Sequence, residues 1–299
     1  YMSRHSYTFA PAHFKIYLLV LISAFGDTKE DVRSKIFRKL EAYRINNIFK
    51  TMSSLTEVQC CAQCLEEDSC VSTNFRTNST SQNCNLNSMS PLEANVSIEK
   101  SANWSVFYLD NDPWNLVFRL TAGGGTDPYQ AWKNGVGTNN SDDCMMLYPP
   151  WCTSYYRHEL LDEWGKWNIE QVKFALYENH TQTAYIIFNG TGSDIESWFS
   201  RGRLLESSWA DIMGTSQLLY FSIKGDTALG RQFFIQEYYG GCPGDRGWTM
   251  AVSGIFRGCS FDKHPSYPGI VYARNGTKST YYSTGYGVAD VLAVYVKLK

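Results

Sequence analysis

The chain has 299 residues, of which 27 are basic and 29 acidic, so its formal net charge is −2, and 15% of its residues are aromatic. This balance excludes the basic footprint of a nucleic-acid-binding protein and the acidic blocks of a polyanion that gathers cations. The aromatic content favours a packed core over disorder, and the length favours two domains.

Residues 1–26 have the layout of a secretory signal peptide. Basic residues and no acidic ones come before or at the start of an apolar stretch, residues 16–25, which ends in small residues. We predict cleavage after Gly26, with the mature chain beginning near Asp27. The alternative is an uncleaved membrane anchor, but about ten apolar residues are half of the roughly 20 that a membrane span needs.

Asparagine sequons follow along the mature chain, none with proline in the middle position. An N-linked glycan is bulky and polar, so each occupied asparagine must lie on the surface. We expect N-glycosylation at Asn78, Asn95, Asn103, Asn139, Asn179, Asn189 and Asn275.

The nine cysteines fall into two sets, one closely and one widely spaced, which indicates two differently built domains. A polar, Pro-containing segment at 110–113 is typical of a linker and places the boundary near residue 112. The predicted parts are a signal peptide (1–26), a lead segment (27–38), a first domain (39–110) and a β-rich second domain of unknown function (113–299). The two sets are Cys60, Cys61, Cys64, Cys70 and Cys84, then Cys144, Cys152, Cys242 and Cys259.

In the first domain, Ser54-Leu-Thr-Glu57 matches a capping box, and the apolar residues after it recur at helical spacing. We predict a helix over 55–67, with Cys60 and Cys64 on one face of it. Strand-like segments follow at 71–75, 84–86 and 104–109. The sequence thus predicts a small α+β module that needs disulfides, because about 70 residues bury little apolar surface.

These residues resemble the core of a PAN/Apple domain. The resemblance rests on Phe49, Ser53, Cys60-x3-Cys64-x5-Cys70, Ser72, Asn74-Phe75 and Cys84-Asn-Leu-Asn87. It implies a five-stranded antiparallel sheet crossed by one helix, and it pairs Cys60 with Cys84 and Cys64 with Cys70. The chain departs from full Apple domains because it lacks cysteines for their outer bridge and carries an extra one, Cys61. PAN domains bind proteins or carbohydrates without catalysis, so the resemblance implies a recognition role.

The second domain shows no helical periodicity of any length. Short runs rich in aromatic and β-branched residues alternate instead with turn signals, which predicts a mostly antiparallel β-sandwich. The predicted strands are 114–120, 172–177, 184–188, 218–223, 232–235, 248–252 and 291–296.

Taken whole, the order of features resembles uncharacterised secreted proteins from the skeletal organic matrix of reef-building corals. The second-domain segments that carry this resemblance are Trp114-Asn-Leu-Val-Phe-Arg119, Tyr129-Gln-Ala-Trp132, Ile187-Phe-Asn-Gly190, Gly240-Gly-Cys-Pro243, Gly247-Trp248 and Ala289-Asp290. The resemblance implies a place in a calcified extracellular matrix and no particular activity.

Catalysis needs convergent titratable groups, and few candidates are present. Outside the signal peptide and the sequons only His158 and His264 remain as bases, and no Gly-x-Ser-x-Gly elbow accompanies them. We therefore expect no enzyme activity and no catalytic residue.

Cofactor and metal motifs are equally incomplete. The segment 123–128 is Gly-rich but lacks the Lys and the following helix of a P-loop, so a wide turn is expected. Asp142, Asp143 and Asp226 lack the spacing of a calcium loop. We expect neither a cofactor nor a metal ion.

Cys61-Ala-Gln-Cys64 has a redox or zinc spacing, but in an oxidising compartment and with no histidine beside it the cysteines are expected to form disulfides. In the second domain, sequence proximity favours Cys144 with Cys152 and Cys242 with Cys259, although spacing leaves the connectivity open. Cys61 is left over. It either links two chains in a matrix or is a buried free thiol on the core face of the helix.

The sequence therefore predicts a secreted glycoprotein that is a structural or adhesive component of an extracellular, calcified skeletal organic matrix. Its expected partners are matrix proteins or glycans, with calcium carbonate mineral contacted at most indirectly, and neither nucleic acid nor a membrane. The alternative is a lectin-like carbohydrate-binding recognition protein. An exposed aromatic side chain beside polar groups in a shallow groove would favour that alternative.

Overall fold

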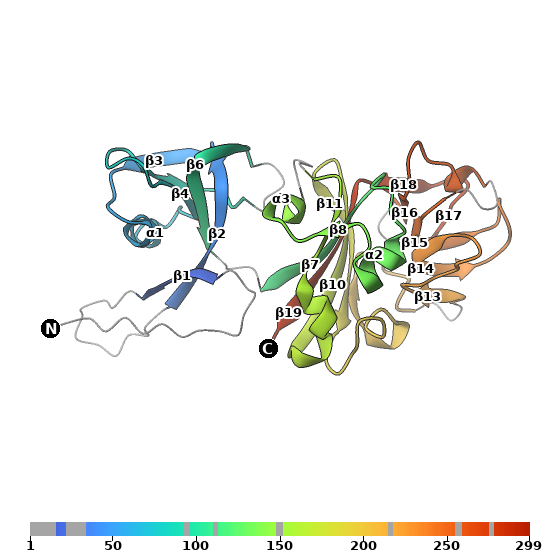
Figure 1. Ribbon diagram of the computed structural model, residues 1–299. Helices are drawn as coiled ribbons and strands as arrows, with labels where there is room; N and C mark the ends of the chain where they lie inside the picture. Colours follow the sequence, from blue (N-terminus) through green and yellow to red (C-terminus); the bar gives the residue numbers. More distant parts are fainter. Residues whose placement is uncertain are drawn as a thin grey trace. The chain divides into compact units, whose positions relative to one another are not determined.

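A computed structural model of the whole chain (Figure 1) describes residues 16–21, 34–91, 96–109, 113–147, 152–214, 218–254, 259–274 and 278–299. For 16–21, 34–36, 38 and 142 it describes the backbone alone. The chain divides into two compact units, residues 1–111 and 112–299. The predicted linker lies at this division, and its residues 110–112 are outside the described residues.

Unit 1 is an antiparallel sheet with a helix, α1, on one face. The six strands lie in the order β1-β2-β6-β4-β5-β3. Their bounds are β1 (Ile16–Leu21), β2 (Ser34–Ile45), β3 (Ile48–Met52), β4 (Ser72–Arg76), β5 (Cys84–Asn87) and β6 (Ile98–Leu109), and α1 spans Glu57–Leu65.

The sheet has one strand more than the PAN resemblance implies. The extra strand, β1, comes from the apolar stretch interpreted as a signal peptide and pairs with β2. An apolar stretch with a β-branched residue suits an edge strand as well as a signal sequence. The predicted cut after Gly26 lies outside the described residues. Of the helices in the described part of the chain, none is long and apolar enough to cross a membrane.

Two predicted boundaries in unit 1 are wrong. The lead segment was expected to run to residue 38, but β2 already begins at Ser34. The helix is shorter than the predicted 55–67 at both ends, since its N-cap is Thr56 and not Ser54 and its last residue is Leu65. The Thr56 hydroxyl accepts a hydrogen bond from the Gln59 backbone N–H at 3.1 Å. The capping residues are therefore Thr56 and Gln59, two positions later than the motif suggested.

Unit 2 contains two further sheets. One is seven-stranded, in the order β12-β11-β10-β19-β7-β9-β8, and the other has the order β13-β14-β15-β16-β18 with β17 beside β15. All pairs are antiparallel except β8 with β9. Their bounds are β7 (Trp114–Thr121), β8 (Thr138–Asn139), β9 (Tyr155–Arg157), β10 (Ile169–Glu178), β11 (Thr181–Asn189), β12 (Leu204–Ser207), β13 (Tyr220–Ser222), β14 (Arg231–Tyr238), β15 (Arg246–Val252), β16 (Gly269–Ala273), β17 (Thr280–Tyr281), β18 (Tyr286–Ala289) and β19 (Val291–Leu298).

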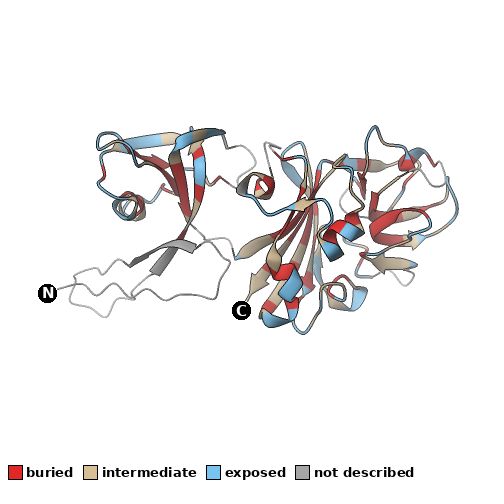
Figure 2. Ribbon diagram, viewed as in Figure 1, coloured by how far each residue is buried: buried red, intermediate tan, exposed pale blue. Residues whose placement is uncertain are grey.

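Aromatic side chains join the two sheets of unit 2. Phe233 of β14 stacks at 6.0 Å on Phe118 of β7 and at 6.3 Å on Phe174 of β10. Trp132 meets Phe118 edge to face at 5.3 Å. These separations lie in the favourable range for aromatic pairs, and all four side chains are fully buried. Figure 2 shows buried residues alternating with intermediate ones in the strands of unit 2. The aromatic content of the sequence is used chiefly as core.

Unit 2 also contains short helices that the sequence analysis did not predict. They are α2 (Pro128–Asn134), α3 (Asp142–Met145) and the 3₁₀ helices η1 (Glu159–Lys166), η2 (Arg201–Arg203) and η3 (Ser260–Asp262). The start and stop signals of α2 are present in the sequence. Asp127 caps it by accepting from the Gln130 N–H, Pro128 is its first residue and Gly135 ends it in the left-handed conformation. Seven residues are too few to show a helical period.

Candidate functional site

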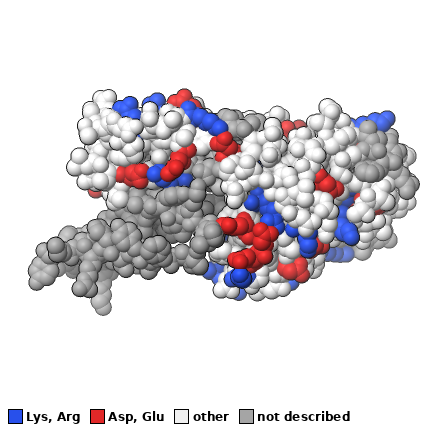
Figure 3. Space-filling view, viewed as in Figure 1, with Lys and Arg blue, Asp and Glu red and all other residues white. Residues whose placement is uncertain are grey.

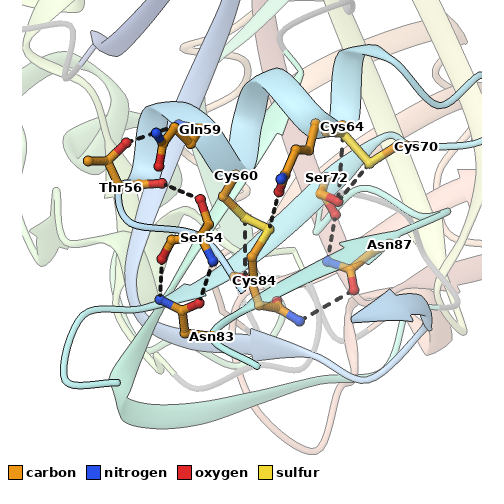
Figure 4. The surroundings of a disulfide bond; sticks show 12 residues. Ser54, Thr56, Gln59, Cys60, Cys64, Cys70, Ser72, Asn83, Cys84 and Asn87 are labelled. Atoms are coloured by element: carbon orange, nitrogen blue, oxygen red, sulfur yellow. Dashed lines mark hydrogen bonds between the residues drawn. A yellow bond between two sulfur atoms is a disulfide. The ribbon is translucent and has the colours of Figure 1, made fainter. Parts of the chain in front are cut away.

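A candidate surface of unit 1 lies at the start of α1, a helix that two disulfides hold at its middle and near its C-terminal end (Figure 4). Cys60 is bonded to Cys84 of β5, and Cys64 to Cys70 in the loop before β4. These are the pairs that the PAN resemblance implies. The helix is thus joined covalently both to the sheet beneath it and to the loop that follows it.

The segment that leads into α1 is held by Asn83. Its carboxamide accepts from the Ser54 backbone N–H at 2.9 Å and donates to the Ser54 carbonyl at 2.7 Å. The same side chain donates to the carbonyl of Ser79 in the β4–β5 hairpin. The Leu55 N–H donates to the Gln59 side chain at 3.0 Å. The backbone on both sides of Leu55 is therefore fixed.

Two apolar side chains project from this fixed backbone. Leu55 is 79% exposed and Val58 is 45% exposed. Beside them lies a shallow hollow lined by Ser53, Ser54, Leu55, Gln59, Ala62, Gln63 and Glu66. These exposed apolar side chains thus lie on a fixed backbone beside amides and a carboxylate, an arrangement that a partner can cover at a small cost in backbone entropy.

One ion pair ties the first turn of α1 to the sheet. Lys39 of β2 donates to Glu57 at 3.0 Å and lies 3.4 Å from Glu41. Partial burial lowers the pKa of Lys39, but the hydrogen bonds and charges of these two carboxylates outweigh that effect, so its pKa is raised. Lys39 stays charged, and Glu57 is in turn favourably placed at the helix N-terminus.

The Ser-x-Asn-Phe and Cys-x-Leu-Asn motifs have structural roles behind this surface. Asn87 donates to the Ser72 hydroxyl at 3.2 Å, and Ser72 donates to the Met89 carbonyl at 2.6 Å. Asn74 donates to Asn87 at 3.3 Å. All three side chains are buried, and buried polar groups of this kind need such partners. The network fixes β4 against β5.

Cys61 lies within the same core as the disulfides and is a fully buried free thiol. Burial raises the pKa of the thiol to about 12, against the effect of the Thr73 hydroxyl. A protonated thiol without solvent access is unreactive. Of the two interpretations left open by the sequence, this geometry favours the buried free thiol over the bond between chains.

The four cysteines of unit 2 form the two pairs that are nearest in sequence, as expected. Cys144 is bonded to Cys152, and Cys242 to Cys259. The first loop is anchored by the buried guanidinium of Arg119, which donates to the carbonyls of Cys144, Met146 and Cys152 at 2.7–2.9 Å. Sequence reasoning missed this role of Arg119, because an arginine in a strand gives no sign of burial.

Five of the predicted sequon asparagines lie on the surface. Asn78, Asn103, Asn139, Asn179 and Asn189 are all exposed. The other two, Asn95 and Asn275, lie outside the described residues. The five positions are therefore sterically open to a glycan, and glycosylation itself stays a prediction.

The two candidate histidine bases have structural contacts. His158 Nδ1 accepts from the Leu160 N–H at 2.9 Å and so caps η1. The His264 ring lies 3.0 Å from the Phe261 carbonyl, and burial lowers the pKa of His264. These contacts give both rings a place in packing and capping. The absence of enzyme activity stays a prediction.

The Gly-rich segment 123–128 is a turn, as expected, although a helix does follow it, contrary to the sequence analysis. The N–H groups of Gly123 and Gly125 donate to the carbonyls of Pro268 and Tyr267 at 2.9 and 2.8 Å. These groups are therefore not available to a phosphate.

The acidic candidates do not converge on a cation. Asp226 accepts from the backbone N–H groups of Ala228 and Leu229, as in a tight turn. Among the described residues, no group of three or more His, Cys, Asp or Glu side chains is arranged to hold a metal ion.

The face shown in Figure 3 carries charges of both signs in small groups, with no continuous field of one sign.

A helix clamped by two disulfides on an antiparallel sheet defines a small, disulfide-stapled α+β module. Residues 36–112 match the family model of the PAN domain, so the chain contains a PAN domain there. The match begins three residues before the predicted start at 39. PAN domains occur in extracellular adhesive proteins and in proteins that bind carbohydrates or other proteins. Together with four disulfides, the domain indicates an extracellular protein.

No curated protein matches the chain. The resemblance of the whole chain to skeletal organic matrix proteins of corals therefore has no support from a relative.

Proposed function

We propose that this protein is a secreted structural or adhesive glycoprotein of an extracellular matrix, and that it binds a matrix protein through the surface formed by Leu55, Val58 and the adjoining hollow. The observation that carries the proposal is the exposure of Leu55, 79%, on a backbone fixed by Asn83 and by two disulfides. Because the backbone around Leu55 is already fixed, a partner that covers this side chain causes little loss of backbone conformational entropy.

The electrostatics agree with a protein partner. The hollow contributes two glutamines, two serines and a single carboxylate, Glu66, so hydrogen bonds and apolar contact dominate over charge. A site of this composition binds with weak dependence on salt. The more specific placement in a calcified skeletal matrix rests on the sequence resemblance alone, and contact with mineral would then be indirect.

The test is retention on washed, decalcified extracellular matrix. The tagged full chain is compared with the double variant Leu55→Ser/Val58→Ser, and with Val136→Ser/Leu205→Ser, which removes two similarly exposed apolar side chains of unit 2. We expect the wild type and the control to be retained in moderate salt and the Leu55/Val58 variant to be washed out. Equal retention of all three, or none of the wild type, would refute the proposal.

A second candidate function is lectin-like carbohydrate recognition by unit 2. It is favoured by the exposed tyrosines Tyr238 and Tyr281, which lie beside the ion pair of Arg246 with Glu237.

A further inference from the structure

Three residues from three neighbouring strands of unit 2 form a row. Tyr238 of β14 is the ladder partner of Arg246 of β15, and Arg246 is the ladder partner of Tyr281 of β17. Directly paired residues project from the same face of a sheet, and adjacent strands are about 4.8 Å apart, so the two tyrosines are separated by about 10 Å with the arginine between them. We call these three residues the Tyr–Arg–Tyr row.

The row is open to solvent. Tyr238 is 51% exposed and Tyr281 46%. Among the described residues one further aromatic side chain is comparably exposed, Phe49 of unit 1, and none of the described tryptophans is. Two of the three exposed aromatic side chains therefore lie on one row of one sheet, which is unexpected for residues scattered singly over a surface.

A carboxylate is directed to the centre of the row by a β-bulge. The pairing of β14 with β15 shifts between Gln236 and Tyr238, so Glu237 is the extra residue. Its carboxylate accepts from Arg246 Nη2 at 2.8 Å and from the Ser279 hydroxyl at 2.5 Å. The Arg246 guanidinium lies 5.5 Å from the centre of the Tyr281 ring. A donor and an acceptor of opposite charge are thus fixed between two aromatic rings.

The residues adjacent in sequence to the row hold it from below. Asp245, Tyr239 and Tyr282 each neighbour one member, and the first two are bonded to the buried guanidinium of Arg231. Arg231 donates to Asp245 at 3.0 Å and to the Tyr239 hydroxyl at 3.3 Å. The Tyr282 N–H donates to the Asp245 carbonyl at 3.0 Å. The row is therefore preorganised by a buried ionic cluster.

A glycine accounts for the position of the Tyr238 ring. A Cβ atom placed on Gly240 would lie 2.7 Å from Cε1 of that ring, which is closer than van der Waals contact allows. Only glycine at this position lets the ring lie against the backbone. The loop that carries Gly240 is closed by the Cys242–Cys259 disulfide.

From this geometry we propose that the Tyr–Arg–Tyr row binds a neutral saccharide. The C–H faces of pyranose rings stack on tyrosine rings, and the row is about as long as a disaccharide. Sugar hydroxyls both donate and accept, which matches Arg246 as donor and Glu237 as acceptor. The pair has no net charge, because Glu237 neutralises Arg246, so it suits a neutral sugar better than a sulfated or uronic-acid glycan. The proposal rests on the second candidate function, for which it names the ligand class and the residues, and it does not rest on the Leu55 surface.

The test uses the full secreted chain, freed enzymatically of its own N-glycans, on an array of neutral hexose and N-acetylhexosamine oligosaccharides with sulfated and uronate glycans as the acidic arm. Any neutral glycan that binds is then titrated by calorimetry. We expect Tyr238→Ala and Tyr281→Ala each to weaken binding about tenfold or more, as for a central aromatic anchor. Tyr281→Phe should retain most of the affinity, because it keeps the ring.

Leu205→Ala, which trims a side chain of similar exposure on β12, is the matched control and should leave the affinity unchanged. The proposal is overturned if the wild type binds no neutral glycan, if it binds only the acidic arm, or if the double variant Tyr238→Ala/Tyr281→Ala binds as the wild type does. Matrix retention through Leu55 and Val58 would be unaffected by any of these results, so the two proposals fail separately.

Discussion

Asn74 of β4 binds both backbone groups of Ile45 in β2. Its carboxamide accepts from the Ile45 N–H and donates to the Ile45 carbonyl, each at 2.8 Å. β2 and β4 are not neighbours in the sheet, because β6 lies between them. The Asn74 side chain therefore makes the two hydrogen bonds to β2 that an adjacent strand would otherwise make. These two hydrogen bonds fix the end of β2 just before the chain turns into β3.

Replacing Asn74 should destabilise the PAN domain. Asn74→Ala leaves a buried donor and a buried acceptor of Ile45 without partners, and we expect a loss of about 3 kcal/mol in the free energy of unfolding. Denaturant unfolding of the full chain, followed by far-UV circular dichroism, measures this. Thr77→Ala, on the exposed turn after β4, is the control and should be close to neutral. A loss below about 1 kcal/mol for Asn74→Ala would show that water replaces the carboxamide.

Replacing Arg231 should destabilise unit 2 more strongly. Arg231 donates to Asp262 and to Asp245, both at 3.0 Å, and all three side chains are nearly inaccessible to solvent. Arg231→Met leaves two carboxylates buried without a counter-charge, which costs about 4 kcal/mol. Thermal unfolding compared with the exposed Lys224→Met tests this. An equal effect of the two substitutions would mean that the cluster is hydrated in the native protein.

The buried thiol of Cys61 should make the folded chain less stable as the pH rises above 9. The pKa of Cys61 rises from an ordinary value of 9.0 to about 12 in the folded chain because of burial. Between pH 9 and pH 12 the thiol is therefore protonated in the folded chain but ionised in the unfolded chain. Its contribution to the free energy of unfolding is complete below pH 9 and is lost as the pH rises toward 12. Brief urea titrations at pH 8 and pH 10.5 should show a larger drop for the wild type than for Cys61→Ala. Identical drops would contradict the assignment.

The exposed sequons predict where glycans are attached. Asn78, Asn103, Asn139, Asn179 and Asn189 should be occupied in the secreted protein, because each is accessible. Enzymatic deglycosylation in ¹⁸O water followed by peptide mass spectrometry converts each occupied asparagine to a labelled aspartate. Asn46, which is exposed but outside any sequon, is the internal control and should stay unlabelled. Five unlabelled sequons in secreted material would contradict the glycoprotein assignment.

Strands with a clear local signal were predictable from the sequence. β7, β10, β15 and β19 coincide with predicted runs to within a few residues at each end, since aromatic and β-branched residues suit a pleated, buried surface. β2 was not predicted. Its sequence, Ser34–Ile45, is rich in Lys, Arg, Leu, Glu and Ala, which favour helices, and its strand form is imposed by pairing with β6.

The candidate sites depend on contacts that no local pattern contains. The PAN motif located α1 and its disulfides, but the exposure of Leu55 follows from the way Asn83 holds Ser54, 29 residues away. The Tyr–Arg–Tyr row joins residues 238, 246 and 281 through strand register and one bulge. In the sequence these residues are ordinary parts of aromatic segments.

The most direct test of an extracellular, disulfide-stapled protein is peptide mapping of the native chain by mass spectrometry, with and without reduction. The structure predicts four bonded pairs: Cys60–Cys84, Cys64–Cys70, Cys144–Cys152 and Cys242–Cys259. Cys61 should be alkylated only after denaturation. Reduced cysteines throughout, or a dimer linked through Cys61, would contradict it.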